Sequence, residues 1–231
     1  MGILIAIEGT DSSGKQTQSE LVYKKLIEQG IKARLISFPA YSEESSALVK
    51  MYLAGEFGSN PEDVNAYAAA TFYAVDRFAT YRRDWKKDYD NGTVIIADRY
   101  VPSNMIHQAS KLSDASDKRC FIEWLVELEY GHFGLPVPNA TIFLDMPTSS
   151  ALQLMKERAN KIDNSDKKDI HERDVEYLSK SHDNALDIAK LRNWKTISCA
   201  DGDNIRTIDE INSEIMNIVN EIIKKEESSW A

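Results

Sequence analysis

Short apolar runs alternate with longer amphipathic stretches along the chain. Five of these runs are rich in β-branched residues and too short to be helices: 3–8, 32–38, 93–98, 140–145 and 194–199. Mainly apolar runs of this length are typical of strands buried on both faces of a parallel sheet. Helical patterns separate them, so the sequence predicts a doubly wound α/β fold around a five-stranded parallel sheet.

Residues typical of helix ends predict where the first helix stops and where the last helix begins. The first is expected over about 14–29, because Gly30 follows it and can adopt the left-handed conformation of a helix C-terminus. The last is expected to begin at Thr207, which forms a capping-box pattern with Glu210. The positions expected to face the core on these two helices are Leu21, Val22, Leu26, Ile208, Ile211, Ile215, Ile218 and Ile222.

A long helix is expected between the second and third strands. Asn60, Pro61 and Asp63 form the pattern of an N-cap, a first-turn proline and an early acidic residue. The helix should end before the turn signal Asn91-Gly92. The positions expected at core spacing on it are Val64, Ala68, Phe72, Val75 and Phe78.

The segment 156–174 departs from this regularity. It reads KERANKIDNSDKKDIHERD, with many charges and only Ile162 and Ile170 as aliphatic residues larger than alanine. It is too polar to be buried and too long for a tight turn, so we expect a short charged flap between two helices. A solvated surface insertion without a role is the alternative.

Composition narrows the classes of partner. Lys and Arg number 28 and Asp and Glu number 37, so the net charge is −9, which disfavours nucleic acid and anionic membrane surfaces as partners. Cys120 and Cys199 lie far apart, and no apolar run approaches the ~18 residues that span a bilayer. These features predict one domain over 1–231, located in the cytoplasm.

The stretch IEGTDSSGKQTQ, residues 7–18, is the first chemical motif. Gly9, Gly14 and Lys15 match the phosphate loop G-x-x-x-x-G-K-[ST], and the expected strand and helix flank it in the required order. In such a loop, backbone N–H groups, a helix N-terminus and the lysine together hold phosphate oxygens. The predicted ATP-binding residues are Gly9, Thr10, Asp11, Ser12, Ser13, Gly14, Lys15, Gln16 and Thr17.

The loop departs from the pattern at Gln16, which replaces the hydroxyl that would bind Mg²⁺. A glutamine amide oxygen can bind Mg²⁺ weakly, Thr17 could act through water, or nucleotide oxygens and one carboxylate could suffice. Asp98 offers such a carboxylate where its predicted strand ends, next to Arg99 as a phosphate ligand. Without a phosphate loop in the same sheet, this pair would be read as a local salt bridge.

Tyr73 and Arg77 are spaced four residues apart on the expected long helix. An aromatic ring and a planar guanidinium on one face can address the same flat object, such as a nucleobase. The alternative is a tyrosine at the edge of the core beside a solvent-facing arginine.

Together these stretches resemble the thymidylate kinase family, which transfers the γ-phosphoryl group of ATP to dTMP with Mg²⁺. The resemblance rests on IEGTDSSGKQTQ, SFPAY, TFYAVDRF and ADRYVPSNMIHQ, and it continues through the charged segment. It implies a three-layer fold of the P-loop NTPase type, a nucleoside monophosphate kinase that serves nucleotide biosynthesis, and a homodimer. A kinase for another nucleoside monophosphate or a deoxynucleoside, and a catalytically weak nucleotide-binding regulator, are the alternatives.

The resemblance also implies roles for the acceptor-site residues. Asp11 would contact the sugar 3′-hydroxyl, Phe38 would line the nucleoside pocket, Tyr73 would stack on the base and Arg77 would hydrogen-bond it. The remaining acceptor-site residues it implies are Tyr41, Arg99, Ser103 and Gln108. Of these, Arg99 would hold the acceptor phosphate, while Ser103 and Gln108 would close the base pocket.

Three departures from the family pattern concern the phosphate and the pocket. Ala40 and Tyr41 stand after Phe-Pro, where the family often has an arginine, and Ser12 stands where some members carry a loop arginine. His107 replaces a tyrosine common in bacterial members. The residues we expect to act in catalysis are Lys15, Asp98, Arg99 and Arg158, with Asp98 ordering Mg²⁺ and Arg173 as the second choice of flap arginine.

Overall fold

The computed structural model describes residues 1–161, 175–202 and 204–230. Its main sheet is parallel, with strand order β2-β3-β1-β4-β5, so the predicted five-stranded parallel sheet is confirmed. The strands of this sheet are β1 (Ile3–Gly9), β2 (Ala33–Ser37), β3 (Val94–Asp98), β4 (Ala140–Asp145) and β5 (Lys195–Ser198). The α-helices are α1 (Lys15–Glu28), α2 (Ala47–Leu53), α3 (Ala66–Thr80), α4 (Lys86–Asp90), α5 (Val101–His107), α6 (Ala115–Val126), α7 (Thr148–Lys161), α8 (Val175–Leu191) and α9 (Ile208–Trp230).

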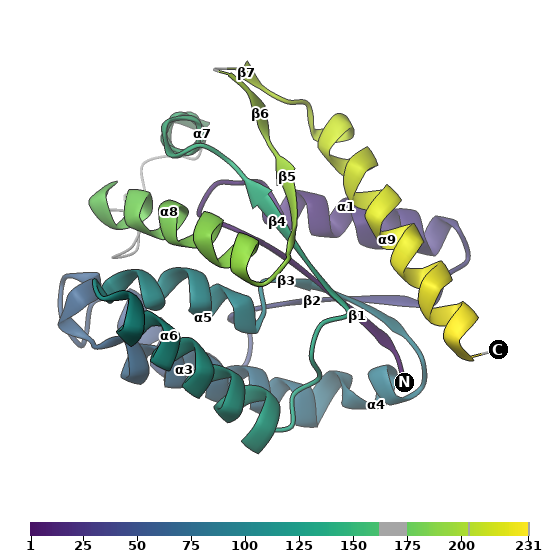
Figure 1. The fold of residues 1–231 in the computed structure, drawn as a ribbon, viewed down its shortest axis with the longest axis horizontal. Coiled ribbons are helices and arrows are strands. Elements are labelled where there is room, and N and C mark those ends of the chain that lie inside the picture. Colours follow the sequence, from purple (N-terminus) through teal and green to yellow (C-terminus); the bar gives the residue numbers. More distant parts are fainter. Residues whose placement is uncertain (162–174, 203, 231) are drawn as a thin grey trace.

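Helices cover both faces of the sheet, which gives three layers. In Figure 1, α1 and α9 lie on one side of the strands, and α3, α5, α6 and α8 lie on the other. Side chains of the central strand β1 pack against both helical layers, because alternate side chains of a strand point to opposite faces of the sheet. Ile5 and Ile7 pack with α1 and α9, whereas Leu4 and Ala6 pack with the opposite helical layer.

The first helix follows the prediction, with one partial exception. Val22 and Leu26 are fully buried, and Gly30 has the left-handed φ of 76° expected after the helix. Leu21 is only half-buried. At the other end of the chain, Glu210 accepts a hydrogen bond from the Thr207 backbone N–H at 2.9 Å, so the predicted capping box is present.

The predicted start of the long helix is wrong. Asn60 donates its backbone N–H to Asp63 Oδ2 at 2.9 Å, but this closes a separate 3-10 turn, Pro61–Asp63. Helix α3 begins at Ala66, where the side chain of Asn65 accepts a hydrogen bond from Ala68 N at 2.9 Å. A second cap five residues further along the chain therefore sets the helix, and it continues through a π-helical turn, Tyr81–Trp85, into α4.

The predicted core face of α3 is also partly wrong. Val75 and Phe78 are 41% and 37% exposed, although their spacing matched a buried stripe. The buried face instead carries small alanines, which let the helix approach its neighbours closely, and Arg77, which is 1% exposed. The carboxylate of Glu129 compensates the charge of Arg77 inside the protein. The other positions buried on this helix are Ala66, Ala69, Ala70, Ala74 and Asp76.

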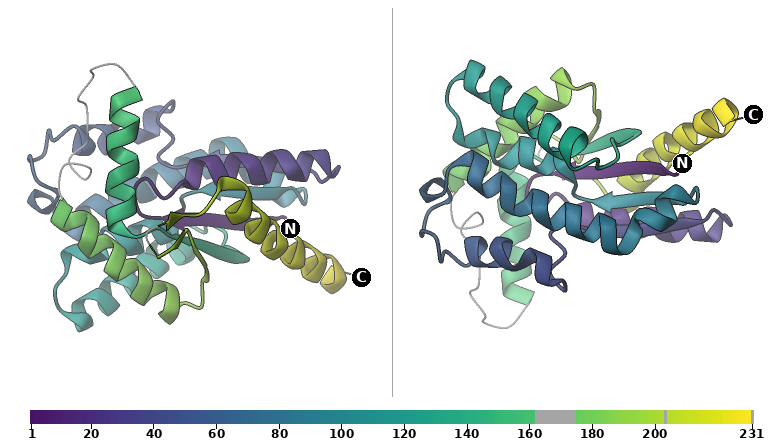
Figure 2. Two further views of the ribbon diagram at one scale, coloured as in Figure 1. Left: turned by 90° about the horizontal axis from the view of Figure 1, so that it is seen from above. Right: turned by 90° about the horizontal axis from the view of Figure 1, so that it is seen from below.

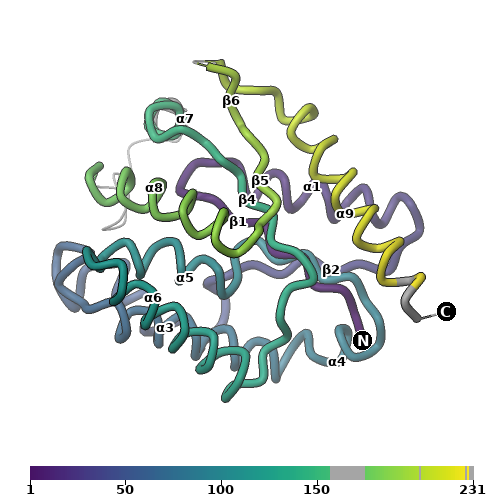
Figure 3. Tube along the Cα trace, in the orientation of Figure 1, coloured from purple at the N-terminus to yellow at the C-terminus, as the bar shows by residue number. Residues whose placement is uncertain are grey.

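The segments that follow β5 hold an element the sequence did not indicate. Ala200–Asp201 and Asn204–Ile205 pair as a two-stranded antiparallel ribbon, β6 and β7, before α9 begins. Figure 3 shows that the chain then returns along α9, so that this helix runs toward the amino ends of the strands, where the N-terminus lies. Of the helices described, none is both long and apolar enough to cross a membrane.

The carboxyl ends of the parallel strands form the edge where open α/β sheets bind ligands. Figure 2 shows α7 at this edge, opposite the chain termini. Helix α7 extends to Lys161, so the first part of the predicted flap is helical. Arg158 therefore belongs to α7, although its side chain is outside the description. Residues 162–174, which include Arg173, lie outside the described residues.

Candidate active site

The phosphate loop connects β1 to α1 through two glycines that the backbone requires. Gly14 has φ 84°, a conformation that a side chain disfavours, directly before the first residue of α1. A Cβ on Gly9 would lie 2.4 Å from Ser13 Oγ and 3.0 Å from the carbonyl oxygen of Leu144, so only glycine fits there. The loop thus packs against the end of β4 and leads into a helix N-terminus, the arrangement that holds phosphate groups.

The side chain of Lys15 folds back over this loop. Its ammonium donates to the carbonyl oxygen of Thr10 at 2.6 Å and lies 3.4 Å from Ser13 Oγ. Burial and, to a lesser extent, the nearby guanidinium of Arg99 lower the pKa of Lys15 to about 8, although Asp11 and Asp98 oppose the change. An ammonium held in this way would gain from an anionic ligand, because a neighbouring negative charge favours its charged form.

A cleft of about 800 Å³ opens beside the loop at the carboxyl end of the sheet. Its lining brings together most of the predicted ATP-binding residues and Asp98, whose Oδ2 lies 3.3 Å from Ser37 Oγ at the end of β2. Gln16 also lines the cleft, but its amide nitrogen donates to Glu20 Oε1 at 2.9 Å. The predicted loop residues that line the cleft are Asp11, Ser12, Gly14, Lys15, Gln16 and Thr17.

An adjoining pocket collects every residue that the sequence placed in the acceptor site. It lies between the phosphate loop, the end of α2, helix α3 and helix α5. The predicted residues that line it are Asp11, Phe38, Tyr41, Tyr73, Arg77, Arg99, Ser103 and Gln108. Asp11, Phe38, Tyr41 and Arg99 line both cavities, so the pocket and the cleft share one wall.

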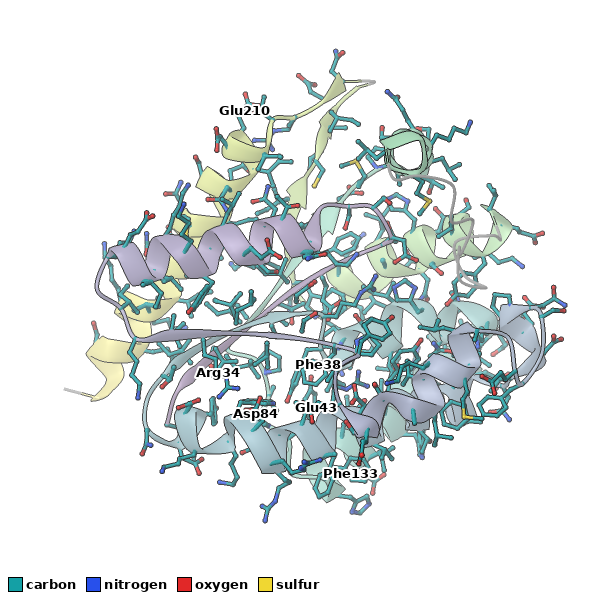
Figure 4. All side chains as sticks on the ribbon, turned by 180° about the vertical axis from the view of Figure 1, so that it is seen from behind. Arg34, Phe38, Glu43, Asp84, Phe133 and Glu210 are labelled. Carbon is teal, nitrogen blue, oxygen red and sulfur yellow. The ribbon has the colours of Figure 1, made fainter. Side chains whose placement is uncertain are left out.

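Phe38 occupies this shared wall directly after β2. It is 3% exposed, and its ring centroid lies 6.0 Å from that of Tyr100. Figure 4 places it in the middle of the molecule, apart from Arg34 and Asp84, which form an ion pair at 2.5 Å nearer the surface. The loop after Phe38 is held by Asp76, which accepts a hydrogen bond from Ala40 N at 2.8 Å.

Arg99 joins the phosphate loop to helix α5. Its Nη2 donates to Asp11 Oδ1 at 2.5 Å, and its Nη1 lies 3.1 Å from His107 Nε2. Burial alone would lower the pKa of Arg99, but the carboxylates of Asp11, Asp98 and Glu8 raise it, so the guanidinium stays charged. A permanent cation therefore sits on the wall between the two cavities.

Arg77 reaches this adjoining pocket from within the core. Its Nε and Nη2 donate to the two carboxylate oxygens of Glu129 at 2.6 and 2.7 Å, and both side chains are essentially fully buried. Its remaining nitrogen, Nη1, lies 3.5 Å from the carbonyl oxygen of Tyr100. Asn104 Nδ2 also donates to Glu129, at 3.2 Å. One edge of the guanidinium is thus fixed by a partner from another helix.

Glu8 anchors the start of α5 to the central strand. One carboxylate oxygen accepts a hydrogen bond from Tyr100 N at 2.7 Å and the other from Ser103 Oγ at 2.6 Å. Burial raises the pKa of Glu8 to about 7, an effect that Ser103 and the charge of Arg99 partly oppose. Ser103, predicted to close the base pocket, therefore lines it while its hydroxyl is committed to Glu8.

Sequence reasoning missed three of these supporting residues: Glu8, Asp76 and Glu129. Each lies far along the chain from the group that it holds, so no local spacing connects the pairs. The only available signal was that polar residues stand where a buried strand or helix face should be apolar, as Glu8 does within β1. A polar residue at such a position needs a partner, which marks it for attention.

The sheet is parallel, a glycine-containing loop connects β1 to α1, and a buried lysine lies over that loop. These features define a P-loop nucleotide-binding protein. The model of the family described as "Thymidylate kinase" matches residues 7–211, which is most of the chain. The chain belongs to the thymidylate kinase family.

Individual relatives agree with this assignment. The chain is 32% identical over 177 residues to the thymidylate kinase of Mycobacterium tuberculosis, covering 75% of this chain and 79% of the relative. It is 26% identical to a probable thymidylate kinase of Thermococcus gammatolerans, covering 96% and 98% of the two chains. It is 23% identical to the thymidylate kinase of Orientia tsutsugamushi, covering 97% and 95%. The similarity thus extends along nearly the whole chain.

Proposed function

We propose that this protein transfers the γ-phosphoryl group of ATP to dTMP, giving dTDP for the synthesis of dTTP. Membership of the thymidylate kinase family supports the reaction. One structural observation supports where the two substrates would bind. The cleft that holds the phosphate loop and the pocket lined by Tyr73 and Arg77 meet at a wall that contains Asp11 and Arg99. Two nucleotides bound on either side would bring their phosphates together at that wall, which is the main requirement of phosphoryl transfer.

On the donor side, the loop amides and the ammonium of Lys15 would hold the β- and γ-phosphates. The oxygen ligands available in the cleft suit Mg²⁺, because Asp98 supplies a carboxylate and Ser37 and Thr17 supply hydroxyls. Asp98 would hold the ion together with ATP oxygens, while the amide nitrogen of Gln16 donates to Glu20 Oε1. When bound, Mg²⁺ would supply neutralisation of the negative charge that builds up on the transferred phosphoryl group.

On the acceptor side, Arg99 would hold the phosphate of dTMP, since its guanidinium is fixed at the shared wall. Asp11 would orient that guanidinium through the 2.5 Å contact and contact the sugar hydroxyl. Phe38 and Tyr73 would enclose the base, with Arg77 at the end of the pocket. Tyr41, Ser103 and Gln108 would complete the lining.

Replacing Tyr73 with alanine is expected to raise the KM for dTMP by roughly tenfold and to leave the KM for ATP unchanged. Base–aromatic stacking is worth about 1–3 kcal/mol per base, and the ring lies in the acceptor pocket only. Tyr73→Phe retains the ring and serves as the matched control. Steady-state kinetics at saturating ATP measures both variants, and an unchanged KM for dTMP in Tyr73→Ala would contradict the stacking role.

We also propose that residues 1–231 form one domain, that the protein works in the cytoplasm, and that it is a homodimer. An apolar surface on α3 supports the dimer, because a second copy could cover it. On this surface the exposed Phe78 packs on Phe133, with ring centroids 5.1 Å apart. Val75 extends this face, and Figure 4 shows Phe133 at the rim of the molecule. Sedimentation equilibrium should give twice the chain mass, and Phe78→Asp should shift it to the single-chain mass.

A panel of acceptors tests the proposed reaction. The purified protein is given Mg²⁺-ATP with dTMP, dUMP, dCMP, AMP or thymidine, and ADP formation is followed. We expect the highest kcat/KM for dTMP. Turnover of another acceptor without turnover of dTMP would contradict the proposal in favour of a different kinase, and binding of ATP and dTMP without turnover of any acceptor would favour a regulator.

A further inference from the structure

His107 is the last residue of α5 and lies at the boundary between the acceptor pocket and the phosphate loop. It lines the pocket and is 6% exposed. Its Nε2 lies 3.1 Å from Arg99 Nη1, on the side of the guanidinium away from Asp11. A guanidinium has only donors, so a hydrogen bond between the two groups needs Nε2 as the acceptor. Such a bond requires a neutral imidazole with its proton on Nδ1.

The ring of His107 is itself held in place. Tyr177 of α8 stacks against it with ring centroids 6.3 Å apart and planes inclined by 20°. The Tyr177 hydroxyl also donates to the backbone carbonyl oxygen of His107 at 3.0 Å. Burial raises the pKa of Tyr177, so this donor stays neutral. Two of the groups that face His107 in the described part of the chain are therefore a permanent cation, Arg99, and a neutral ring, Tyr177, and Asp11 lies beyond the cation.

Arg99 needs such support because its backbone is in an unusual conformation. Its φ is 67°, in the left-handed region that a residue with a side chain seldom adopts. Strain of this kind persists where the surroundings over-determine a conformation, and it is concentrated at functional sites. Here Asp11 holds one terminal nitrogen of the guanidinium and His107 the other, so the plane of the group is set from both ends.

We propose that His107 is a positioning residue for dTMP phosphorylation: its neutral Nε2 aims the Arg99 guanidinium at the acceptor phosphate. This inference rests on the proposed function for the identity of the acceptor. The arrangement of the residues does not depend on it, since the two side chains meet in the protein itself. A side chain that packs in the same space but cannot accept a hydrogen bond would remove the His107 contact and leave the Asp11 contact in place.

Kinetics of two variants test the role. His107→Phe is expected to raise the KM for dTMP by roughly tenfold, equal to about 1.4 kcal/mol, with the KM for ATP within twofold of the parent. His107→Gln retains an acceptor oxygen and is expected to recover most of the affinity for dTMP. Circular dichroism and thermal melting confirm folding. An unchanged KM in His107→Phe, or equal losses in both variants, would overturn the proposal by leaving His107 a packing role only.

A second measurement needs no activity and no substrate. Long-range proton–nitrogen correlation spectra of the ¹⁵N-labelled protein, with His107 assigned by triple resonance, should show the Nδ1–H tautomer at pH 8. An Nε2–H tautomer, or an average of the two, would overturn the proposal. If the parent protein fails to phosphorylate dTMP, the proposed function fails, while this spectrum still decides whether His107 holds Arg99.

Discussion

Lys15→Ala is expected to lower kcat for dTMP phosphorylation by about 10²–10³-fold, as the loss of one group that stabilises transition-state charge typically does. The ammonium lies over the phosphate loop, 2.6 Å from the carbonyl oxygen of Thr10 and buried with the loop. Negative charge accumulates on the transferred phosphoryl oxygens in the transition state, so removing a fixed cation at that place raises the barrier directly. Single-turnover kinetics at saturating ATP and dTMP would measure the chemical step.

Lys24→Ala is the matched control for this variant. It removes the same charge from an exposed position on the same helix, so a general effect of net charge or of helix stability would appear in both. Near-normal kcat in Lys15→Ala, or equal losses in the two variants, would contradict a catalytic role for Lys15.

Glu129→Leu is expected to lower the free energy of unfolding by about 3–5 kcal/mol, the usual cost of leaving one charge of a buried ion pair without its partner. Arg77 and Glu129 are 1% and 0% exposed, so water cannot take over the role of the missing carboxylate. Denaturant unfolding followed by fluorescence would measure the change. A loss below about 1 kcal/mol, the range of exposed ion pairs, would show that Arg77 finds another partner.

The double variant Arg77→Met/Glu129→Leu separates stability from binding. Replacing both buried charges with apolar side chains of similar size is often neutral or stabilising, so the free energy of unfolding should return close to that of the parent. The affinity for dTMP should not return, because the guanidinium that lines the pocket is gone. If the double variant recovers both, Arg77 has a structural role only, and the base pocket works without it.

Local patterns predicted the parts of the fold that depend on neighbouring residues. The strands were recognised because burial on both faces makes each of them an apolar run. The phosphate loop was recognised because Gly9, Gly14 and Lys15 stand at a spacing that the backbone geometry demands. Resemblance to a family predicted that Asp11, Tyr73 and other scattered residues belong to one site, and these residues line one pocket. No spacing within the chain brings those segments together.

Long-range polar contacts explain what the patterns could not predict. Helix α3 buries Arg77 rather than Phe78 because Glu129, more than 50 residues away, compensates its charge. An amphipathicity pattern has no means to represent such a pair. Likewise, Asn60 matched the sequence of a helix start, but it closes a separate turn, and Asn65 caps α3. Two competing caps in a short segment are distinguished only by how the following helix packs.

This one chain is expected to move the γ-phosphoryl group of ATP to the phosphate of dTMP. The direct measurement is incubation of the purified protein with Mg²⁺, dTMP and ATP labelled with ³²P at the γ position, followed by separation of the nucleotides. We predict that the label appears in the β-phosphate of dTDP in step with ADP formation. Label found only in ATP and inorganic phosphate, with no labelled dTDP, would contradict the claim.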